Sequence, residues 1–267
     1  MTKKRADVLL YEKGLVPSRE KGKSLIMSGS VYIGSRRIDK AGQAIDEKKD
    51  IYIKGQPLKY VSRGGLKLEK AIEEFELNLS KAVCMDIGAS TGGFTDCMLQ
   101  NGASKVYAVD VGYGQLDWEL RNNDKVIVMD RTNIRNIRPD DIGEPVDFIS
   151  IDVSFISLSL VLPVAKSILK SEGSIVALIK PQFEAGRGKV GKKGIVKDRS
   201  IHNEVIEKII KISEELNLSV TNLTFSPITG AKGNIEYLIL LNNDGKNTGY
   251  IDKVTISDVI DESIKNL

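Results

Sequence analysis

The 267-residue sequence predicts an α/β protein: a small N-terminal α+β domain followed by a seven-stranded sheet, mostly parallel with an antiparallel last strand. Three observations support this prediction. Apolar, strand-like runs alternate with helix-like segments beyond residue 80. The first of these runs ends in a glycine-rich turn, and the balance of charge changes sign near residue 60. We therefore expect one domain over residues 1–60, a linker at about 58–62 and a larger domain over 63–267.

The charge difference between the two predicted domains is large for a chain whose net charge is only +3. Residues 1–60 hold 14 Lys and Arg against 7 Asp and Glu, whereas residues 61–267 hold 25 against 29. A basic module favours a polyanionic partner, although a solvated lysine-rich surface has the same composition. The sequence has no apolar run of the roughly 20 residues that cross a membrane, and no signal peptide. We expect a cytoplasmic protein with free, structural thiols at Cys84 and Cys97.

The first domain is predicted to contain two helices followed by short strands. One helix covers residues 5–16 with Val8, Leu9, Leu10 and Leu15 inward, and Ser18 caps a second that runs to residue 28. Strands are expected at 31–33, 36–38 and 50–53, with a turn at Gly34-Ser35.

The order of residues in this domain resembles the S4 RNA-binding domain over about 55 residues. The segments that carry the resemblance are Arg5-Ala6-Asp7-Val8-Leu9-Leu10, Pro17-Ser18-Arg19 and Leu25 to Ile33. The resemblance implies that basic side chains on the second helix and the following turn contact structured RNA by its shape. Each of these side chains can instead be a solvated surface charge. The candidate RNA-binding residues are Arg5, Arg19, Lys21, Lys23, Arg36 and Arg37.

The second domain is expected to begin with the connector Leu58 to Val61 and a helix over about 66–75, before the sheet. Its strands are predicted at 82–87, 105–110, 125–129, 146–152, 173–180, 218–225 and 235–241. No helix separates the last two, so the sheet should end in an antiparallel hairpin. Seven strands with this ending are typical of the Rossmann-like methyltransferase arrangement, which binds ligands at the carboxyl ends of its strands.

A glycine-rich turn after the first strand predicts a nucleotide-like cofactor. The spacing is Gly-x-x-x-Gly-Gly and no Gly-Lys-Ser/Thr follows, which disfavours both dinucleotides and triphosphates. S-adenosyl-L-methionine is the leading candidate. A tight turn without a ligand is the alternative interpretation. The candidate cofactor-binding residues at this turn are Asp86, Gly88, Ser90, Thr91, Gly92, Gly93 and Phe94.

The next three strands each end in an aspartate, and these residues strengthen the prediction of an adenosyl cofactor. Asp110 is expected to accept both ribose hydroxyls, and Asp130 to accept from the adenine amino group. Asp152 closes the fourth strand and is expected near the sulfonium. Aspartates at strand ends also cap helices, which is the structural alternative.

The residues at the strand ends also limit the reaction. The segment Asp152 to Ser157 has no proline pair of the kind that base amino-group methyltransferases use, and residues 146–241 contain no cysteine nucleophile for carbon methylation. The set Lys67, Asp152, Lys180 and Glu236 resembles the tetrad of the FtsJ family of ribose 2′-O-methyltransferases.

This resemblance gives each member of the tetrad an expected role. Lys180 is the base, Asp152 orients it, and Lys67 and Glu236 position the hydroxyl and tune the charge. No metal is required for an in-line displacement. A buried ion-pair network without catalysis is the alternative.

The motifs taken together are similar to the TlyA family over nearly the whole chain. They are Ser62 to Leu68, Gly88 to Thr95, Asp152 to Ser157 and Lys180 to Glu184. The resemblance implies a ribosomal RNA cytidine 2′-O-methyltransferase that acts on ribosomes or their subunits, here expected to be a monomer. Members are also named haemolysins, but the sequence gives little support to a membrane-active protein. A non-catalytic RNA-binding assembly factor is a second alternative.

Two further features have less specific interpretations. Residues 184–198 are predicted to form a mobile basic loop that either clamps RNA or is simply solvated. The only histidine, His202, is expected on a helix surface, away from any metal or catalysis. The basic residues of this loop are Arg187, Lys189, Lys192, Lys193 and Lys197.

Overall fold

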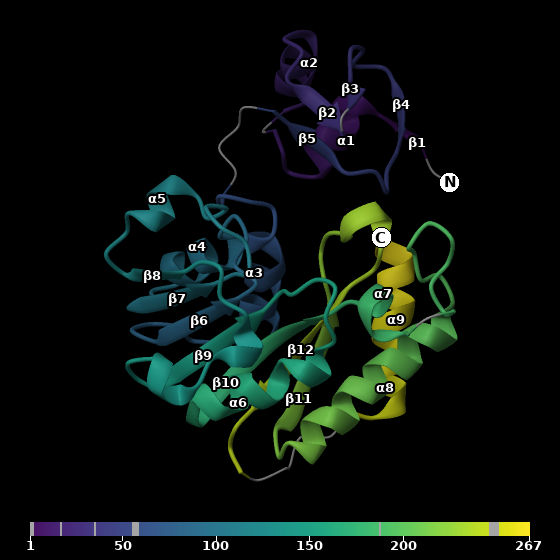
Figure 1. The fold of residues 1–267 in the computed structure, drawn as a ribbon. Coiled ribbons are helices and arrows are strands. Elements are labelled where there is room, and N and C mark those ends of the chain that lie inside the picture. Colours follow the sequence, from purple (N-terminus) through teal and green to yellow (C-terminus); the bar gives the residue numbers. More distant parts are fainter. Residues whose placement is uncertain (1–2, 17, 35, 55–58, 187, 246–250) are drawn as a thin grey trace. The chain divides into compact units, whose positions relative to one another are not determined.

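A computed structural model describes residues 3–16, 18–34, 36–54, 59–186, 188–245 and 251–267. The chain divides into two compact units, residues 1–58 and residues 59–267 (Figure 1). Pro17, Ser35, Leu58 and Arg187, which belong to the predicted S4 motif, turn, linker and basic loop, lie outside the described residues.

The first unit contains two helices and two small antiparallel sheets. Its helices are α1 (Ala6–Glu12) and α2 (Arg19–Met27), and Ser18 caps α2 as predicted by accepting from the Lys21 amide. Strands β2 (Val31–Ile33), β3 (Arg36–Arg37) and β5 (Ile51–Ile53) form one sheet in the order β3-β2-β5. β1 (Lys3–Arg5) pairs with β4 (Ala44–Asp46) in a second sheet that the sequence did not predict.

The second unit is built on a seven-stranded sheet in the order β11-β12-β10-β9-β6-β7-β8. All seven predicted strands are present, and β12 runs antiparallel to both β10 and β11, as the predicted hairpin requires. The strands are β6 (Val83–Ile87), β7 (Lys105–Val109), β8 (Val126–Met129), β9 (Val146–Ile151), β10 (Leu169–Ile179), β11 (Ser219–Phe225) and β12 (Tyr237–Asn242).

Helices cover both faces of this sheet, because successive residues of buried strands point to opposite sides and both sides are apolar. On one face, α3 (Gly65–Glu74) and α4 (Gly93–Gln100) pack on a core that includes Cys84 and Phe148. On the other, α6 (Leu162–Ile168), α8 (Arg199–Glu215) and α9 (Lys253–Asn266) pack on a core that includes Met85 and Ile149. The short helices are α5 (Trp118–Arg121) and α7 (Pro181–Glu184), with 3₁₀ turns η1 (Ile134–Asn136), η2 (Pro139–Asp141), η3 (Leu158–Leu160) and η4 (Ala231–Gly233).

The strand directions bring the predicted site residues to one edge of the sheet. β6, β7, β9 and β10 are parallel, so their carboxyl ends meet there. The antiparallel β12 begins at the same edge, with Tyr237 opposite Ile179. Lys180 follows Ile179 and Glu236 precedes Tyr237, so these two residues are neighbours although they are far apart in sequence.

Two single-residue expectations have different outcomes. Cys84 and Cys97 are free and buried, as predicted. The prediction for His202 is wrong: it is only 2% exposed, its Nδ1 lies 2.7 Å from the Tyr237 hydroxyl and its Nε2 lies 3.1 Å from the Val196 carbonyl. Burial holds the pKa of His202 below its ordinary value.

No helix in the described part of the chain combines the length and the apolar character that a membrane span needs.

Candidate functional site

The turn between β6 and α4 brings backbone close to its neighbours, which explains two of its glycines. Gly88 has a φ of +90°, and a Cβ atom there would lie 2.5 Å from the Asp152 carbonyl oxygen. Gly92, with a φ of +95°, leads into α4, and its Cβ atom would collide with the Leu120 side chain. A side chain at either position would therefore displace the turn. The turn leaves open space on its outer side.

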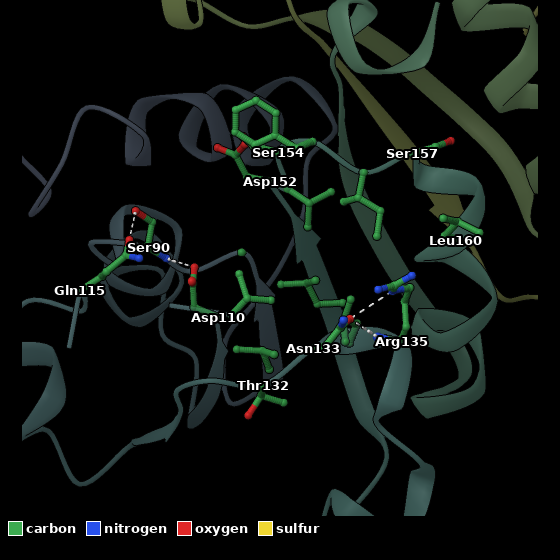
Figure 2. A pocket seen from close by; sticks show the side chains of 18 residues that line it. Ser90, Asp110, Gln115, Thr132, Asn133, Arg135, Asp152, Ser154, Ser157 and Leu160 are labelled. Carbon is green, nitrogen blue, oxygen red and sulfur yellow. Dashed lines mark hydrogen bonds between the residues drawn. The ribbon is translucent and has the colours of Figure 1, made fainter. Parts of the chain in front are cut away.

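A cavity of about 720 Å³ opens beside this turn, within the usual range for a small-molecule site (Figure 2). Asp110 lines it. One oxygen of this carboxylate accepts from the Ser90 amide at 2.8 Å and the other from the Gly112 amide at 2.7 Å. Asp110 therefore fixes the turn as well as facing the cavity. The lining also includes Thr132, Asn133, Ile134 and Arg135.

A second cavity of about 230 Å³ adjoins the first and is lined by two of the four predicted catalytic residues, Asp152 and Lys180. The two cavities share Gly88, Ser90, Asp152 and Ser154. Lys180 lines the smaller one. The predicted cofactor-binding residues that line one or both cavities are Gly88, Ser90, Thr91, Gly93, Phe94, Asp110 and Asp152.

Two aspartates predicted to contact the cofactor line neither cavity, and their side chains are used elsewhere. Asp86 is fully buried, and one of its oxygens accepts from the Thr95 amide at 2.9 Å and the Thr95 hydroxyl at 2.7 Å. Burial raises the pKa of Asp86 to about 7, and the nearby charge of Asp152 also raises it. We correct its predicted role from cofactor contact to support of the first turn of α4.

Asp130 also lines neither cavity. Its carboxylate accepts from the Arg121 guanidinium at 2.7 Å and from the Gly114 amide at 3.2 Å. Burial opposes ionisation, but these donors lower the pKa of Asp130 below its ordinary value. The side chain thus ties α5 to the end of β8. Gly92 also lies outside both linings and acts through the shape of the turn.

The predicted tetrad comes together as a chain of alternating charges. Lys180 Nζ lies 2.5 Å from Asp152 Oδ1, and Lys67 Nζ lies 3.6 Å from Asp152 Oδ2. Lys67 Nζ is also 2.6 Å from Glu236 Oε2. One member lies in α3, and the others lie directly after β9, directly after β10 and directly before β12. Two cations and two anions therefore balance in a largely buried cluster.

The two lysines of the tetrad have different surroundings. Burial alone would lower the pKa of Lys67, but the charges of Asp152 and Glu236 outweigh it and raise this pKa above its ordinary value. Lys67 therefore stays protonated. Lys180 contacts one carboxylate, donates to the Ser154 hydroxyl at 3.1 Å and faces the smaller cavity. Of the two lysines, only Lys180 lines a cavity described above.

Sequence reasoning missed an aromatic pair at the mouth of the site. Phe155 is 90% exposed with a φ of +63°, and its ring centroid lies 4.9 Å from that of Phe183. An exposed phenylalanine in a left-handed conformation is unusual and marks functional strain. Its place directly after Asp152-Val153-Ser154 was the available signal. Gln182 was also missed: its amide nitrogen lies 3.4 Å from Glu236 Oε1.

The predicted RNA-binding residues of the first unit fall into two groups. Arg5 and Arg19 lie 3.0 Å and 3.7 Å from the buried carboxylate of Asp7, so they also stabilise the fold. Arg37 pairs with the exposed Asp39 at 2.6 Å. Lys21 and Arg36 are exposed and Lys23 is partly exposed.

The basic loop is tied down at its end. The Asn234 side chain accepts from the Val196 amide at 3.1 Å and donates to the Gly194 carbonyl at 2.9 Å. Lys189 forms an ion pair with Glu204 of α8. Lys192, Lys193 and Lys197 are exposed. Within the described residues, no group of three or more His, Cys, Asp or Glu side chains could hold a metal ion.

Comparison with known proteins adds independent findings. Residues 60–243 match the family described as FtsJ-like methyltransferase, and residues 4–51 match the S4 domain. The chain is 51% identical to YqxC of Bacillus subtilis, covering 99% of this chain and 95% of that protein. It is 40% identical to the 16S/23S rRNA (cytidine-2′-O)-methyltransferase TlyA of Mycobacterium tuberculosis, covering 89% of each. A solved structure of a candidate hemolysin from Streptococcus thermophilus is 48% identical, with a TM-score of 0.76 and coverage of 100% of this chain and 97% of that one.

Proposed function

Because the chain belongs to the TlyA family, which joins an S4 domain to an FtsJ-like methyltransferase domain, we propose that it methylates the 2′-hydroxyl of a cytidine in ribosomal RNA. The observation that carries this proposal is the meeting of Lys67, Asp152, Lys180 and Glu236 beside the smaller cavity. A cluster built only for stability has no need to open onto a cavity. Burial of two lysines and two carboxylates is costly, so such clusters are more often kept for a function.

The residues present fit S-adenosyl-L-methionine as methyl donor. The larger cavity has room for an adenosyl group, the turn after β6 can approach it closely, and Asp110 offers carboxylate oxygens to ribose hydroxyls. The smaller cavity, lined by Thr91, Gly93 and Phe94, would take the amino-acid end. When bound, the cofactor supplies an electrophilic methyl group on a positively charged sulfur. Asp152, shared by both cavities, would lie near that charge.

The chain's own residues would orient and deprotonate the ribose hydroxyl. Lys180 would take the proton at Nζ in its neutral form, after losing its own proton, because it lines the cavity, whereas Lys67 is held as a cation between two carboxylates. Asp152 would orient Lys180, and Glu236 would hold Lys67 in place. The exposed ring of Phe155 would offer the target base a stacking surface at the cavity mouth. Fixed orientation would supply much of the acceleration.

The first unit would bind ribosomal RNA through its basic side chains, and residues 1–60 and 63–267 would act as separate RNA-binding and catalytic domains. One chain suffices for the reaction, because all four tetrad residues and both cavities come from residues 59–267 of a single chain. We therefore propose a monomer. Action on ribosomal subunits would place it in the cytoplasm.

The test is transfer of a labelled methyl group from S-adenosyl-L-methionine to unmodified small and large ribosomal subunits, assayed separately. Nuclease digestion then locates the label, and we expect 2′-O-methylcytidine. Lys180→Ala should abolish transfer, while Lys211→Ala, an exposed lysine on α8, serves as the matched control. Cofactor binding without label in either subunit would reject the proposed function. Label in a base instead of the ribose would reject the assigned chemistry.

A further inference from the structure

We propose that Glu184 is a positioning residue for methyl transfer, holding the loop that carries Asp152 against the turn that carries Lys180. The inference rests on the proposed function for the reaction itself. Glu184 is the last residue of α7, which begins directly after Lys180, and only 2% of its side chain is exposed. A carboxylate this buried requires polar partners, and the identity of those partners indicates what it does.

Both carboxylate oxygens of Glu184 bind the segment that follows residues 152–156, which we call the Asp152 loop. Oε1 accepts from the Leu158 amide at 2.7 Å, and Oε2 accepts from the Ser157 hydroxyl at 2.7 Å. Lys208 of α8 donates to the same Oε2 and to the Glu184 carbonyl, each at 3.1 Å, which balances the buried charge. Glu184 thus links the segment that follows β10 to the segment that follows β9. Its contacts lie at the end of residues 152–156 that is farther along the chain from β9.

The Asp152 loop needs such an anchor, because part of it is poorly packed. Phe155 is 90% exposed and has a φ of +63°, a conformation that costs a non-glycine residue on the order of 1 kcal/mol or more. Strain of this kind persists only where neighbouring contacts fix the backbone. The Phe155 and Phe183 rings, 4.9 Å apart, give a second contact between the same two segments.

The contacts of Glu184 affect the distance between Lys180 and Asp152 in the candidate active site. Lys180 Nζ and Asp152 Oδ1 are 2.5 Å apart, but they belong to different loops. If the two loops separate, Asp152 no longer orients Lys180. A misplacement of about 1 Å can cost an enzyme up to about 100-fold in rate. Glu184 does not line either cavity, so its loss should affect turnover without removing a ligand contact.

A length series at position 184 tests the proposal. Glu184→Gln keeps the side-chain length, an oxygen that can accept from the Leu158 amide and a nitrogen that can donate to the Ser157 hydroxyl, but it removes the acceptor of Lys208. Glu184→Asp keeps the charge but is one methylene shorter, and Glu184→Ala removes both length and charge. We expect kcat on ribosomal subunits to fall about tenfold or more for the Asp and Ala variants and to stay within about threefold for Gln. KM for the subunit and Kd for S-adenosyl-L-methionine should change by less than about threefold. Glu215→Ala, an exposed carboxylate on α8, is the control.

Hydrogen exchange gives a readout that does not need turnover. The Leu158 amide should exchange faster in the Ala and Asp variants, with exchange in β6 and β7 unchanged. If Glu184→Ala does not fold, Ser157→Ala removes one partner and should lower kcat severalfold with the same exchange signature. Because Ser157 also lines the larger cavity, Kd for S-adenosyl-L-methionine is measured on this variant too and should change by less than about threefold. Wild-type kcat in folded Glu184→Ala, or rescue by Asp and not by Gln, would overturn the proposal. Failure of the proposed function would differ, since the wild-type protein itself would then transfer no methyl group.

Discussion

The two units use charged residues in opposite ways. In the second unit, Lys67, Lys180 and Glu236 are each at most 8% exposed, and the tetrad is paired at fixed distances. In the first unit, Lys21, Arg36 and Arg37 are exposed. Buried, paired charged groups can be positioned for proton transfer to or from one atom. Exposed cations instead bind a phosphate backbone without one fixed geometry. The difference indicates that chemistry and RNA attachment can be weakened separately.

The largest expected effect is at Lys180, where the comparison predicts loss of chemistry without loss of binding. Lys180→Ala should lower kcat about 10³-fold, in the range for removing a general base. Lys180→Arg should be equally inactive, because a guanidinium stays protonated at all working pH values. Kd for the cofactor by calorimetry and for subunits by filter binding should change less than threefold. Loss of subunit binding in parallel with kcat would break the comparison.

A second test displaces the tetrad without changing any of its members. A Cβ atom on Gly230 would collide with Glu236 Oε1, so Gly230→Ala should push this carboxylate from Lys67. We expect kcat to fall on the order of 10- to 100-fold and the melting temperature to drop, since a buried ion pair is disturbed. Gly143→Ala is the matched control, because its nearest neighbour would be 3.8 Å away. Unchanged kcat in folded Gly230→Ala would show that the Lys67 to Glu236 contact is dispensable.

Changes in the first unit should have smaller effects and a different signature. Replacing Lys21 and Arg36 with Gln should raise KM for ribosomal subunits severalfold at unchanged kcat. Each lost phosphate contact should also reduce the slope of log affinity against log salt by about 1. Lys13→Gln, an exposed lysine just beyond α1, provides a control. A fall in kcat at saturating substrate would mean that these residues do more than attach RNA.

Much of this arrangement was predictable from sequence, and the exceptions share a physical cause. The seven strands follow from apolar runs, and the tetrad follows from the resemblance of four residues to the FtsJ family, three of them at strand ends and Lys67 on a helix. Asp86 and Asp130 line neither cavity, because a strand-end carboxylate can face a ligand or a neighbouring helix. Which one it faces depends on packing, here on Thr95 and Arg121. His202 was misplaced for the same reason: its partner Tyr237 lies on a strand distant in sequence.

β1 and β4 were missed because three-residue strands carry almost no periodic signal, and their pairing depends on contacts across the first unit. Glu184 belongs to a motif that the sequence shows, but its partners Ser157, Leu158 and Lys208 come from two other segments. Sequence reasoning thus located the chemical groups and not the contacts that orient them.

The smallest expected effect on activity is at Asp86, which tests whether a buried carboxyl outside the tetrad acts only on stability. Its pKa is raised from 3.8 to about 7, chiefly by burial, so the folded state binds its proton more tightly than the unfolded state. The resulting stability is fully present below pH 3.8 and is lost as pH rises through about 7. Asp86→Asn, which has no proton to lose, should remove this dependence.

The free energy of unfolding of the wild-type protein relative to Asp86→Asn should therefore fall between about pH 4 and pH 7, by on the order of 1 kcal/mol for each step of one in pH. Chemical denaturation at several pH values measures this difference directly. Methyl transfer at pH 7 should stay within about threefold, because the amide oxygen can still accept from Thr95. A difference that does not change between about pH 4 and pH 7 would mean that the Asp86 carboxyl is already charged in the folded state over this whole range. A large loss of kcat at unchanged stability would instead tie Asp86 to the reaction, through the neighbouring charge of Asp152 that already contributes to its raised pKa.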